Sequence, residues 1–400
     1  MRMMNALTIA AALSLTAGIA SAEDIPIKIG VLNDRSGIYS DLSGEGSVIA
    51  ARMAVEDFGA NSKGIKVEIV SADHQNKPDI ASNIARQWID QDGVDVIADL
   101  PTSSAALAVS EVVREKNKIL LVTTAATSDL TGAKCSPNTV HWTYDTWALA
   151  HGTGKAMVEQ GGKKWFFITA DYAFGQALER DTAAVVKASG GEVVGSVKHP
   201  FPGQDFSSFL LQAQSSGAQV IGLANAGGDT INSIKQAAEF GITQGGQKLA
   251  GLLIFITDVH ALGLETAQGL VLTEAFYWDK DDGTRAFAKR FGERFGGKMP
   301  SMVHAGAYAS VLHYLKAVAA LKSKDPKAVM AKMKEMPSDD PLFGKGQIRA
   351  DGRHVHDMYL VEVKKPEESK GPWDYYKTLA TIPAGQAFRP LDQGGCPLVK

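Results

Sequence analysis

Hydroxyl-bearing and small residues stand together at two places in the sequence where a short apolar run ends. Thr102-Ser103-Ser104 follows Val94–Ala98, and Thr124–Thr127 follows Ile119–Thr123. Hydroxyls and unhindered backbone N–H groups donate hydrogen bonds that suit a carboxylate without supplying a full positive charge. A competing interpretation is that these hydroxyls only cap helices. Taken together, the two stretches predict a pocket for a carboxylate.

Aromatic and polar residues occupy the corresponding positions elsewhere in the chain. They follow apolar runs at 25–32, 164–169, 220–224 and 252–256, each of which is expected to be a strand. The side chains of this kind are Tyr39, Tyr172, Phe174, Asn225, Thr257 and Asp258. An aromatic wall opposite a hydroxyl-rich wall suits a small organic carboxylate with an apolar body.

Sequence signatures of enzymes and cofactor sites are absent. The chain has no Gly-x-Ser-x-Gly elbow, no phosphate-binding loop and no His-Glu-x-x-His. His354 and His356, beside Asp357, would lie on one face of a strand and are suited to a metal. Two surface histidines on an edge strand is the favoured interpretation. We therefore expect a protein that is not an enzyme and has neither metal nor cofactor.

Length and charge limit the classes of protein to which the chain can belong. It has 400 residues, with 41 Lys and Arg against 44 Asp and Glu, a formal net charge of −3. Hydrophobic residues make up 45% and charged residues 21%, which is typical of a soluble globular protein. The length predicts two domains. The near-neutral charge argues against a nucleic-acid-binding protein, which needs a basic surface.

The first 22 residues have the pattern of a secretory signal peptide. Arg2 precedes the apolar run Ala6–Ala20, which is shorter than the roughly 20 residues that span a bilayer. Small residues at Ala20 and Ala22 predict cleavage after Ala22. An ordinary N-terminal core helix is the alternative. No later apolar run of about 20 residues exists, so we expect an exported, soluble protein.

Two cysteines in an exported chain favour one disulfide bond between Cys135 and Cys396 over two separate thiols. Such a bond would hold the C-terminal segment against the body of the protein.

Short β-branched runs alternate with amphipathic helical runs along most of the chain, which predicts βαβ units on parallel sheets. One series of such units runs to about residue 143 and a second to about 275, followed by three helices and two strands. The expected strands are 25–32, 65–70, 94–98, 119–123, 164–169, 192–197, 220–224, 252–256, 346–349 and 358–362. Two similar α/β lobes joined by a hinge explain this order.

Several stretches, in order and spacing, resemble the leucine/isoleucine/valine-binding protein family. The likeness begins with Ile27–Leu32, Ser36–Tyr39 and Ala50–Asp57, and continues through the hydroxyl-rich loops to Asp171–Gly175 and Gln204–Ser207. This family comprises periplasmic solute-binding components of ABC importers. The resemblance implies the type I periplasmic-binding-protein fold, with two Rossmann-like lobes on parallel central sheets joined by a multi-strand hinge.

The resemblance also implies a division of the chain, a location and partners. The division is a signal peptide at 1–22, an N-terminal lobe from 23–143 plus 278–341, a C-terminal lobe from 144–277 plus 342–363, and a tail at 364–400. The hinge would cross near Trp142–Asp145, Leu272–Trp278 and Pro341–Gly344. The protein would be a periplasmic monomer that gives its ligand to an ABC transporter permease in the inner membrane.

Roles for individual residues follow from the family's pattern. Thr102, Ser103, the backbone of Ala125 and Thr127 would hold the ligand carboxylate, and Ala126, in the same loop, is a further ligand-binding candidate. Family members that bind amino acids usually meet the ammonium with a glutamate, where this chain has Thr257-Asp258. That difference and the aromatic residues favour an aromatic acid or another apolar carboxylate, with a branched-chain amino acid still open. Alternatives are an amide- or urea-binding protein or a ligand sensor of the same fold, or an exported hydrolase.

Overall fold

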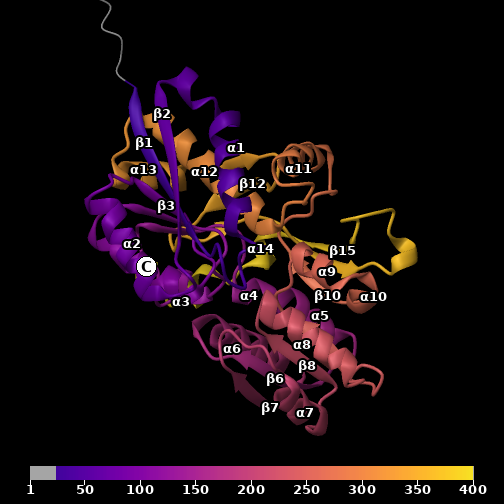
Figure 1. Ribbon diagram of the computed structural model, residues 1–400. Coiled ribbons are helices and arrows are strands. Elements are labelled where there is room, and N and C mark those ends of the chain that lie inside the picture. Colours follow the sequence, from indigo (N-terminus) through magenta and orange to yellow (C-terminus); the bar gives the residue numbers. More distant parts are fainter. Residues whose placement is uncertain (1–23, 400) are drawn as a thin grey trace, which may run out of the picture.

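The computed structural model describes residues 24–399, so the predicted signal peptide lies outside the described residues. Two α/β units lie one above the other in Figure 1, with the chain passing between them more than once. No helix within residues 24–399 has the length and apolar character needed to cross a membrane.

The first lobe is built on a five-stranded parallel sheet, as the alternating pattern predicts. Its strands, in the order β2-β1-β3-β4-β5, are β2 (Ile65–Asp73), β1 (Ile25–Asn33), β3 (Val96–Asp99), β4 (Ile119–Val122) and β5 (Thr139–His141). β3 and β4 are buried along their whole length, which explains the apolar runs Val96–Ala98 and Ile119–Val122. The covering helices are α1 (Gly44–Phe58), α2 (Pro78–Asp90), α3 (Ser103–Glu115) and, far along the chain, α12 (Met302–Leu321), which packs along α1.

The second lobe has a four-stranded parallel sheet in the order β7-β6-β8-β9. The strands are β7 (Glu192–His199), β6 (Lys164–Ala170), β8 (Val220–Ala224) and β9 (Lys248–Gly251). The main helices are α6 (Ala173–Ala188), α7 (Ser207–Ser215), α8 (Gly228–Glu239) and α9 (Ile256–Leu262).

The strand predicted at 252–256 is wrong. β9 ends at Gly251, and the apolar residues after it form a buried loop that enters α9. A short apolar run signals burial without distinguishing a strand from a buried loop.

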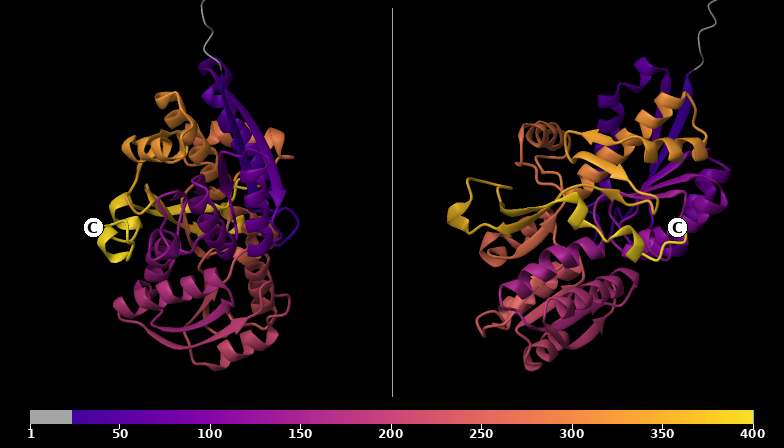
Figure 2. Two further views of the ribbon diagram at one scale, coloured as in Figure 1. Left: turned by 90° about the vertical axis from the view of Figure 1, so that its left-hand side faces the viewer. Right: turned by 180° about the vertical axis from the view of Figure 1, so that it is seen from behind.

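Smaller elements connect and flank the two lobes. They are η1 (Ala60–Lys63), η2 (Ser128–Thr131), α4 (Thr146–Leu149), η3 (Ala150–Gly154), α5 (Lys155–Glu159), α10 (Leu264–Ala267), β10 (Val271–Glu274), α11 (Asp282–Arg294), α13 (Pro326–Glu335), β11 (Ser338–Asp340), β12 (Gly344–Ile348), β13 (His354–Val355), β14 (Met358–Val363), η4 (Pro366–Glu368), β15 (Tyr376–Ile382), α14 (Ala384–Ala387) and η5 (Leu391–Gln393). β10, β14 and β15 form an antiparallel sheet, so the segment predicted as a tail carries a strand of its own. Figure 2 shows this sheet from behind, at the level where the two lobes meet.

The third connection between the lobes lies later in the chain than the pattern predicts. β11, β12 and β13 pair with one another, and Arg353 bridges to His141 at the edge of the first sheet. β14 instead pairs with β10, which contacts β9 of the second lobe. We therefore propose that the third crossing lies at residues 356–357 rather than at Pro341–Gly344. The other lobe boundaries stay a prediction.

The prediction that His354 and His356 are surface residues is wrong, because both are fully buried. His354 stacks on Trp142 with 3.9 Å between ring centroids, and its Nε2 lies 2.6 Å from Ser338 Oγ. His356 Nε2 lies 2.8 Å from the Thr143 carbonyl. Burial lowers the pKa of both imidazoles, that of His356 to about 4. The two histidines therefore join β13 and the residue after it to the first crossing segment. Residues 24–399 hold no cluster of three or more side chains suited to a metal ion.

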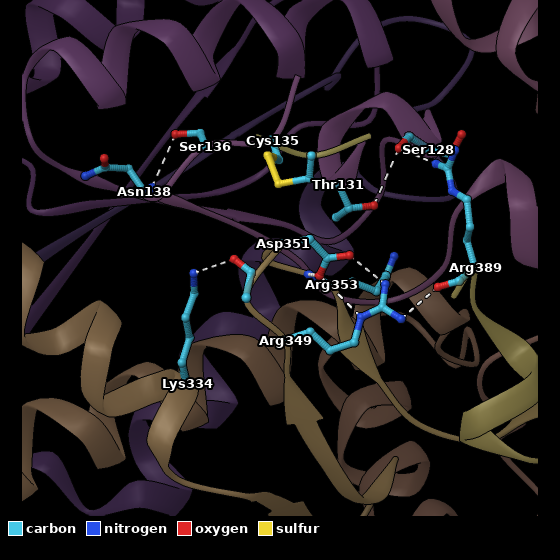
Figure 3. The surroundings of a disulfide bond; sticks show 12 residues. Ser128, Thr131, Cys135, Ser136, Asn138, Lys334, Arg349, Asp351, Arg353 and Arg389 are labelled. Carbon is cyan, nitrogen blue, oxygen red and sulfur yellow. Dashed lines mark hydrogen bonds and ion pairs between the residues drawn. A yellow bond between two sulfur atoms is a disulfide. The ribbon is translucent and has the colours of Figure 1, made fainter. Parts of the chain in front are cut away.

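The predicted disulfide bond is confirmed. Cys135 and Cys396 are bonded with 5.7 Å between their Cα atoms. Next to the bond, Arg389 donates from Nη2 to the Ser128 carbonyl at 2.9 Å, and Arg349 donates to the Arg389 carbonyl at 2.8 Å (Figure 3). The C-terminal segment is therefore fixed to the first lobe by one covalent bond and by hydrogen bonds of the Arg389 side chain and the Arg389 carbonyl.

Replacing Cys396 by serine should lower the free energy of unfolding by about 2–4 kcal/mol, because the bond closes a long loop in the unfolded chain. Urea unfolding followed by circular dichroism measures this change. C135S is the matched control and should show the same loss, and the double variant should lose no more than either single one. Equal stability of oxidised wild type and C396S would contradict the prediction.

Candidate functional site

A cavity lies between the two lobes, at the carboxyl ends of the strands of both parallel sheets. Its volume is about 10 Å³, roughly the room that one water needs. The lining residues from the first lobe and its crossing are Tyr39, Leu42, Pro101, Thr124, Ala126 and Tyr144, and those from the second lobe are Tyr172, Phe174, Ala226, Leu253 and Phe255. No lining side chain carries a charge at neutral pH. The cavity is therefore small, aromatic and electrically neutral.

Two tyrosines from opposite lobes meet at the cavity. The hydroxyls of Tyr39 and Tyr172 are 2.6 Å apart. Burial raises the pKa of both phenols well above its usual range, so both keep their protons at neutral pH. Two hydroxyls hold two protons, and the bond between them uses one. The pair can therefore donate one further hydrogen bond to a ligand.

Asp34 fixes the loop that carries Tyr39. Its Oδ1 accepts from the Gly37 N–H at 2.7 Å, and its Oδ2 accepts from the Tyr39 N–H at 2.9 Å and from Asn76 Nδ2 at 2.6 Å. A Cβ on Gly37 would lie 2.7 Å from the same carboxylate, so only glycine fits there. These bonds to one carboxylate fix the loop and hold the phenol of Tyr39 toward the second lobe.

The second lobe reaches the Tyr39 loop through glycine. Gly227, after β8, has a φ of 56° in the left-handed region. A Cβ at this position would lie 2.7 Å from the Ile38 carbonyl oxygen and 2.9 Å from the Tyr39 ring. The loop that carries Ala226 thus packs against the first lobe at a distance that a larger residue does not permit.

Asp99 organises the first-lobe wall. Its buried carboxylate accepts hydrogen bonds from Asn33 at 3.0 Å, Ser43 at 2.8 Å and Thr123 at 3.1 Å, and another from the Thr124 hydroxyl. Asp99 and the residue after it have φ values of 87° and 60°, which are strained for side chains of this kind. This turn places Pro101 at the cavity and begins α3 directly behind it.

The remaining polar groups of the wall are engaged inside the protein. Tyr144 donates its hydroxyl proton to the Thr124 carbonyl at 2.5 Å, while the Thr124 hydroxyl donates to Asp99. Among the polar side chains of the described lining, the Tyr39–Tyr172 pair therefore retains a spare donor.

Of the residues predicted to bind ligand, Tyr39, Ala126, Tyr172 and Phe174 line the cavity. The other first-lobe candidates form a layer behind it. Thr102 donates to Asn76 Oδ1, and the Ser103 hydroxyl accepts from the Thr127 N–H at 3.2 Å. Thr127 Oγ1 caps η2 by accepting from the Asp129 N–H at 3.3 Å. Ala125 is buried in the same layer. Direct contact of these residues with a ligand stays a prediction.

The second-lobe candidates that do not line the cavity support its loops. Asn225 donates to Ser233 Oγ at 3.1 Å and accepts from Thr230 at 2.7 Å. Asp258 Oδ2 accepts from the Phe255 N–H at 2.9 Å and so caps α9. Burial raises the pKa of Asp258 to about 7. Thr257 is buried beside it in the first turn of the helix.

Seven lining residues were not among the predicted site residues, namely Leu42, Pro101, Thr124, Tyr144, Ala226, Leu253 and Phe255. Pro101, Thr124 and Ala226 lie in the loops that the strand pattern singled out, each one position from a chosen residue. Tyr144 follows β5, a three-residue strand that the pattern did not reveal. Leu253 and Phe255 were assigned to the strand that proved to be a loop.

Two α/β lobes whose parallel sheets point their carboxyl ends at one cavity define a bilobal solute-binding protein. Residues 26–372 match the family described as periplasmic binding protein. The chain belongs to this family, which confirms the predicted family and its type I fold.

Relatives with curated names or solved structures agree with this placement. The Leu/Ile/Val-binding protein homolog 6 of Brucella melitensis is 28% identical over 91% of this chain and 93% of its own. A crystal structure of a periplasmic binding protein from Burkholderia mallei is 55% identical over 94% of this chain and 99% of its own, with a TM-score of 0.91.

Two further solved structures carry ligand information in their names. A branched-chain amino acid ABC transporter periplasmic ligand-binding protein from Burkholderia xenovorans is 44% identical over 94% of this chain and 100% of its own, with a TM-score of 0.83. A solute-binding protein from Rhodopseudomonas palustris in complex with p-hydroxybenzoic acid is 26% identical over 90% of this chain and 97% of its own, with a TM-score of 0.81.

Asp258→Asn should make the protein more stable at pH 8 and leave its stability unchanged below pH 4. An aspartate with a raised folded-state pKa disfavours the folded state as the pH rises from the unfolded-state value near 4 to about 7. Asparagine keeps the capping oxygen without the charge. We expect a gain of about 1–4 kcal/mol at pH 8, measured by urea unfolding. A gain of the same size at pH 3.5 would contradict this account.

Proposed function

We propose that this protein is the solute-binding component of an ABC importer and captures a small carboxylate with an aromatic or branched apolar body. Its place of action is the periplasm, its form a monomer, and its partner a permease of the inner membrane. It performs no covalent chemistry and uses no cofactor.

The observation that carries this proposal is the composition of the cavity. Its walls are aromatic or aliphatic, with a tyrosine pair that retains one donor and with no charged group among the lining side chains. The N-terminus of α3 begins behind Pro101, and free N–H groups at a helix N-terminus favour an anion. An apolar body and an anionic end both find a matching environment.

The cavity disfavours an α-amino group. A buried ammonium needs a carboxylate partner. Asp258, the candidate for that role, is used to cap α9 and does not line the cavity. The Rhodopseudomonas relative that binds p-hydroxybenzoic acid supports an aromatic acid. The names of the Brucella melitensis and Burkholderia xenovorans relatives support a branched-chain amino acid, which is the second candidate.

Capture requires that the lobes move apart. A volume of about 10 Å³ is far below the roughly 300 Å³ at which ligand pockets begin. The ligand therefore enters when Tyr39 and Tyr172 separate, and it replaces their mutual contact by bridging the two lobes. A ligand that contacts both lobes shifts the equilibrium toward the closed form, which a permease can recognise.

Thermal unfolding with separate additions of benzoate, 4-hydroxybenzoate, leucine, benzamide and urea tests the proposal. We expect an aromatic carboxylate to raise the melting temperature most, since a ligand at 100 times its Kd adds about 2.7 kcal/mol of stability. A larger shift with leucine would favour the second candidate. Stabilisation by benzamide or urea alone would favour an amide-binding protein, and turnover of an ester would contradict the proposal.

Tyr172→Phe should weaken binding of the stabilising ligand by about 1–2 kcal/mol, because it removes a hydrogen-bond donor and retains the ring. Tyr39→Phe should have a similar effect for the same reason. Isothermal titration calorimetry measures both, with Tyr359→Phe, whose side chain does not line the cavity, as the control. Unchanged affinity in both variants would place the ligand's polar end elsewhere.

A further inference from the structure

Ser128 links three parts of the protein outside the cavity. Its N–H donates to Thr146 Oγ1 at 3.1 Å, and its carbonyl accepts from Arg389 in the C-terminal segment (Figure 3). Its hydroxyl donates to Asp181 Oδ2 at 2.7 Å and accepts from Arg180 Nη2 at 2.9 Å. Ser128 belongs to the first lobe, whereas Arg180 and Asp181 lie on α6 of the second lobe. One hydroxyl thus joins the two lobes.

Asp181 is the centre of this contact. It is buried, and its Oδ2 accepts from both Ser128 Oγ and Thr146 Oγ1, the latter at 2.5 Å. Its Oδ1 accepts from Arg180 Nε at 2.9 Å. Arg180 also reaches back to the first lobe, with Nη1 3.1 Å from Asp129 Oδ1. The bonds from the Ser128 hydroxyl to α6 and the Arg180–Asp129 ion pair cross between the lobes. Thr146 contacts both sides, because its Oγ1 accepts from the Ser128 N–H and donates to Asp181, and its helix α4 packs against α6.

The same two segments that meet here also form walls of the cavity. Ala126 lines the cavity, and Ser128 follows two residues later in the same loop. Phe174 lines it from the first turn of α6, and Asp181 lies two turns further along the helix. None of Ser128, Arg180 and Asp181 is a lining residue. Closing the loop and α6 around a ligand therefore brings the three residues together, although the ligand does not touch them.

We propose that Ser128, Asp129, Arg180 and Asp181 form a latch that holds the lobes closed and sets the rate of ligand release. The inference rests on the proposed function. These are positioning residues: they act on the ligand through the separation of the two lobes. When the lobes part, Asp181 loses one of the donors that compensate for its burial, and the Arg180–Asp129 ion pair is broken.

The latch stabilises the closed state selectively because its inter-lobe bonds do not exist when the lobes are apart. A contact present only in the closed state slows opening, and release requires opening. Loss of the latch should thus increase the dissociation rate and leave the association rate almost unchanged, because association starts from the open form. A residue that served only to stabilise one lobe would change the melting temperature without this separation of rates.

Ser128→Ala is the primary variant, because it removes the inter-lobe bonds of the hydroxyl and keeps the contact between Asp181 and Thr146. Stopped-flow tryptophan fluorescence with 4-hydroxybenzoate, or with leucine if only leucine binds, gives both rates. We expect a dissociation rate about 10-fold or more above wild type, the factor that one hydrogen bond to a charged group supplies. Arg86→Ala, which breaks the exposed Arg86–Glu115 pair within the first lobe, is the matched control and should leave both rates unchanged.

Asp129→Asn provides a second, independent variant, since it breaks the ion pair to Arg180 on the surface. It should also increase the dissociation rate. Because salt screens the ion pair, raising the salt concentration should increase the dissociation rate of wild type and leave that of Asp129→Asn almost unchanged. In Ser128→Ala/Asp181→Asn, the change should be smaller than the sum of the two single changes, because both act on the same bond: the first removes it and the second takes away its charge. Dissociation rates within two-fold of wild type in both single variants would overturn the latch.

The latch can also be tested if the proposed function is wrong. If neither 4-hydroxybenzoate nor leucine binds wild type, small-angle X-ray scattering of the protein alone tests the latch by its radius of gyration. Ser128→Ala and Asp129→Asn should then be more extended than wild type and Arg86→Ala. Equal radii for all four proteins would overturn the latch on this independent measurement.

Discussion

The carboxylate of Asp99 is the group on which the first-lobe wall depends. A charge buried this deeply is tolerated only when several donors surround it, and those donors come from the end of β1, the start of α1 and the end of β4. Satisfying one carboxylate therefore fixes the relative positions of three elements. It also holds Asp99 in a strained turn, and that turn determines where Pro101 and the start of α3 meet the cavity.

A buried positive charge has the equivalent role where the chain crosses between the lobes. Arg353 is completely buried, donates to the Tyr144 carbonyl at 2.9 Å and stacks on the ring of Phe388 at 4.5 Å. Asp145 lies 3.5 Å away, and burial lowers the pKa of the guanidinium to about 10. The arginine thereby connects the segment that carries Tyr144 to β13 and to the C-terminal segment. Because the side chains of this crossing segment are packed, few of its residues can change their backbone angles when one lobe rotates relative to the other.

Periodicity predicted the α/β class, both parallel sheets and most helix positions, because long alternating patterns record which faces are buried. It did not reveal β5, β11 and β13, whose two or three residues are too short to show a period. It also misassigned Leu253 and Phe255, since burial in a loop and burial in a strand leave the same apolar signature. The polar choices Thr102, Thr127 and Asn225 show a further limit. Sequence identifies groups able to donate hydrogen bonds, but only the fold shows that these groups already have partners inside the protein.

The disulfide bond has a consequence for the order in which the protein matures. Its two cysteines are 261 positions apart, and the whole second lobe lies within the loop that they close. Because a polypeptide is made from its N-terminus, Cys135 cannot pair with Cys396 until the 261 residues that follow it, up to Cys396, have been synthesised. During that interval the second lobe can acquire its own sheet and core. In that order of events, the covalent bond ties together the two ends of a segment that already contains a folded lobe.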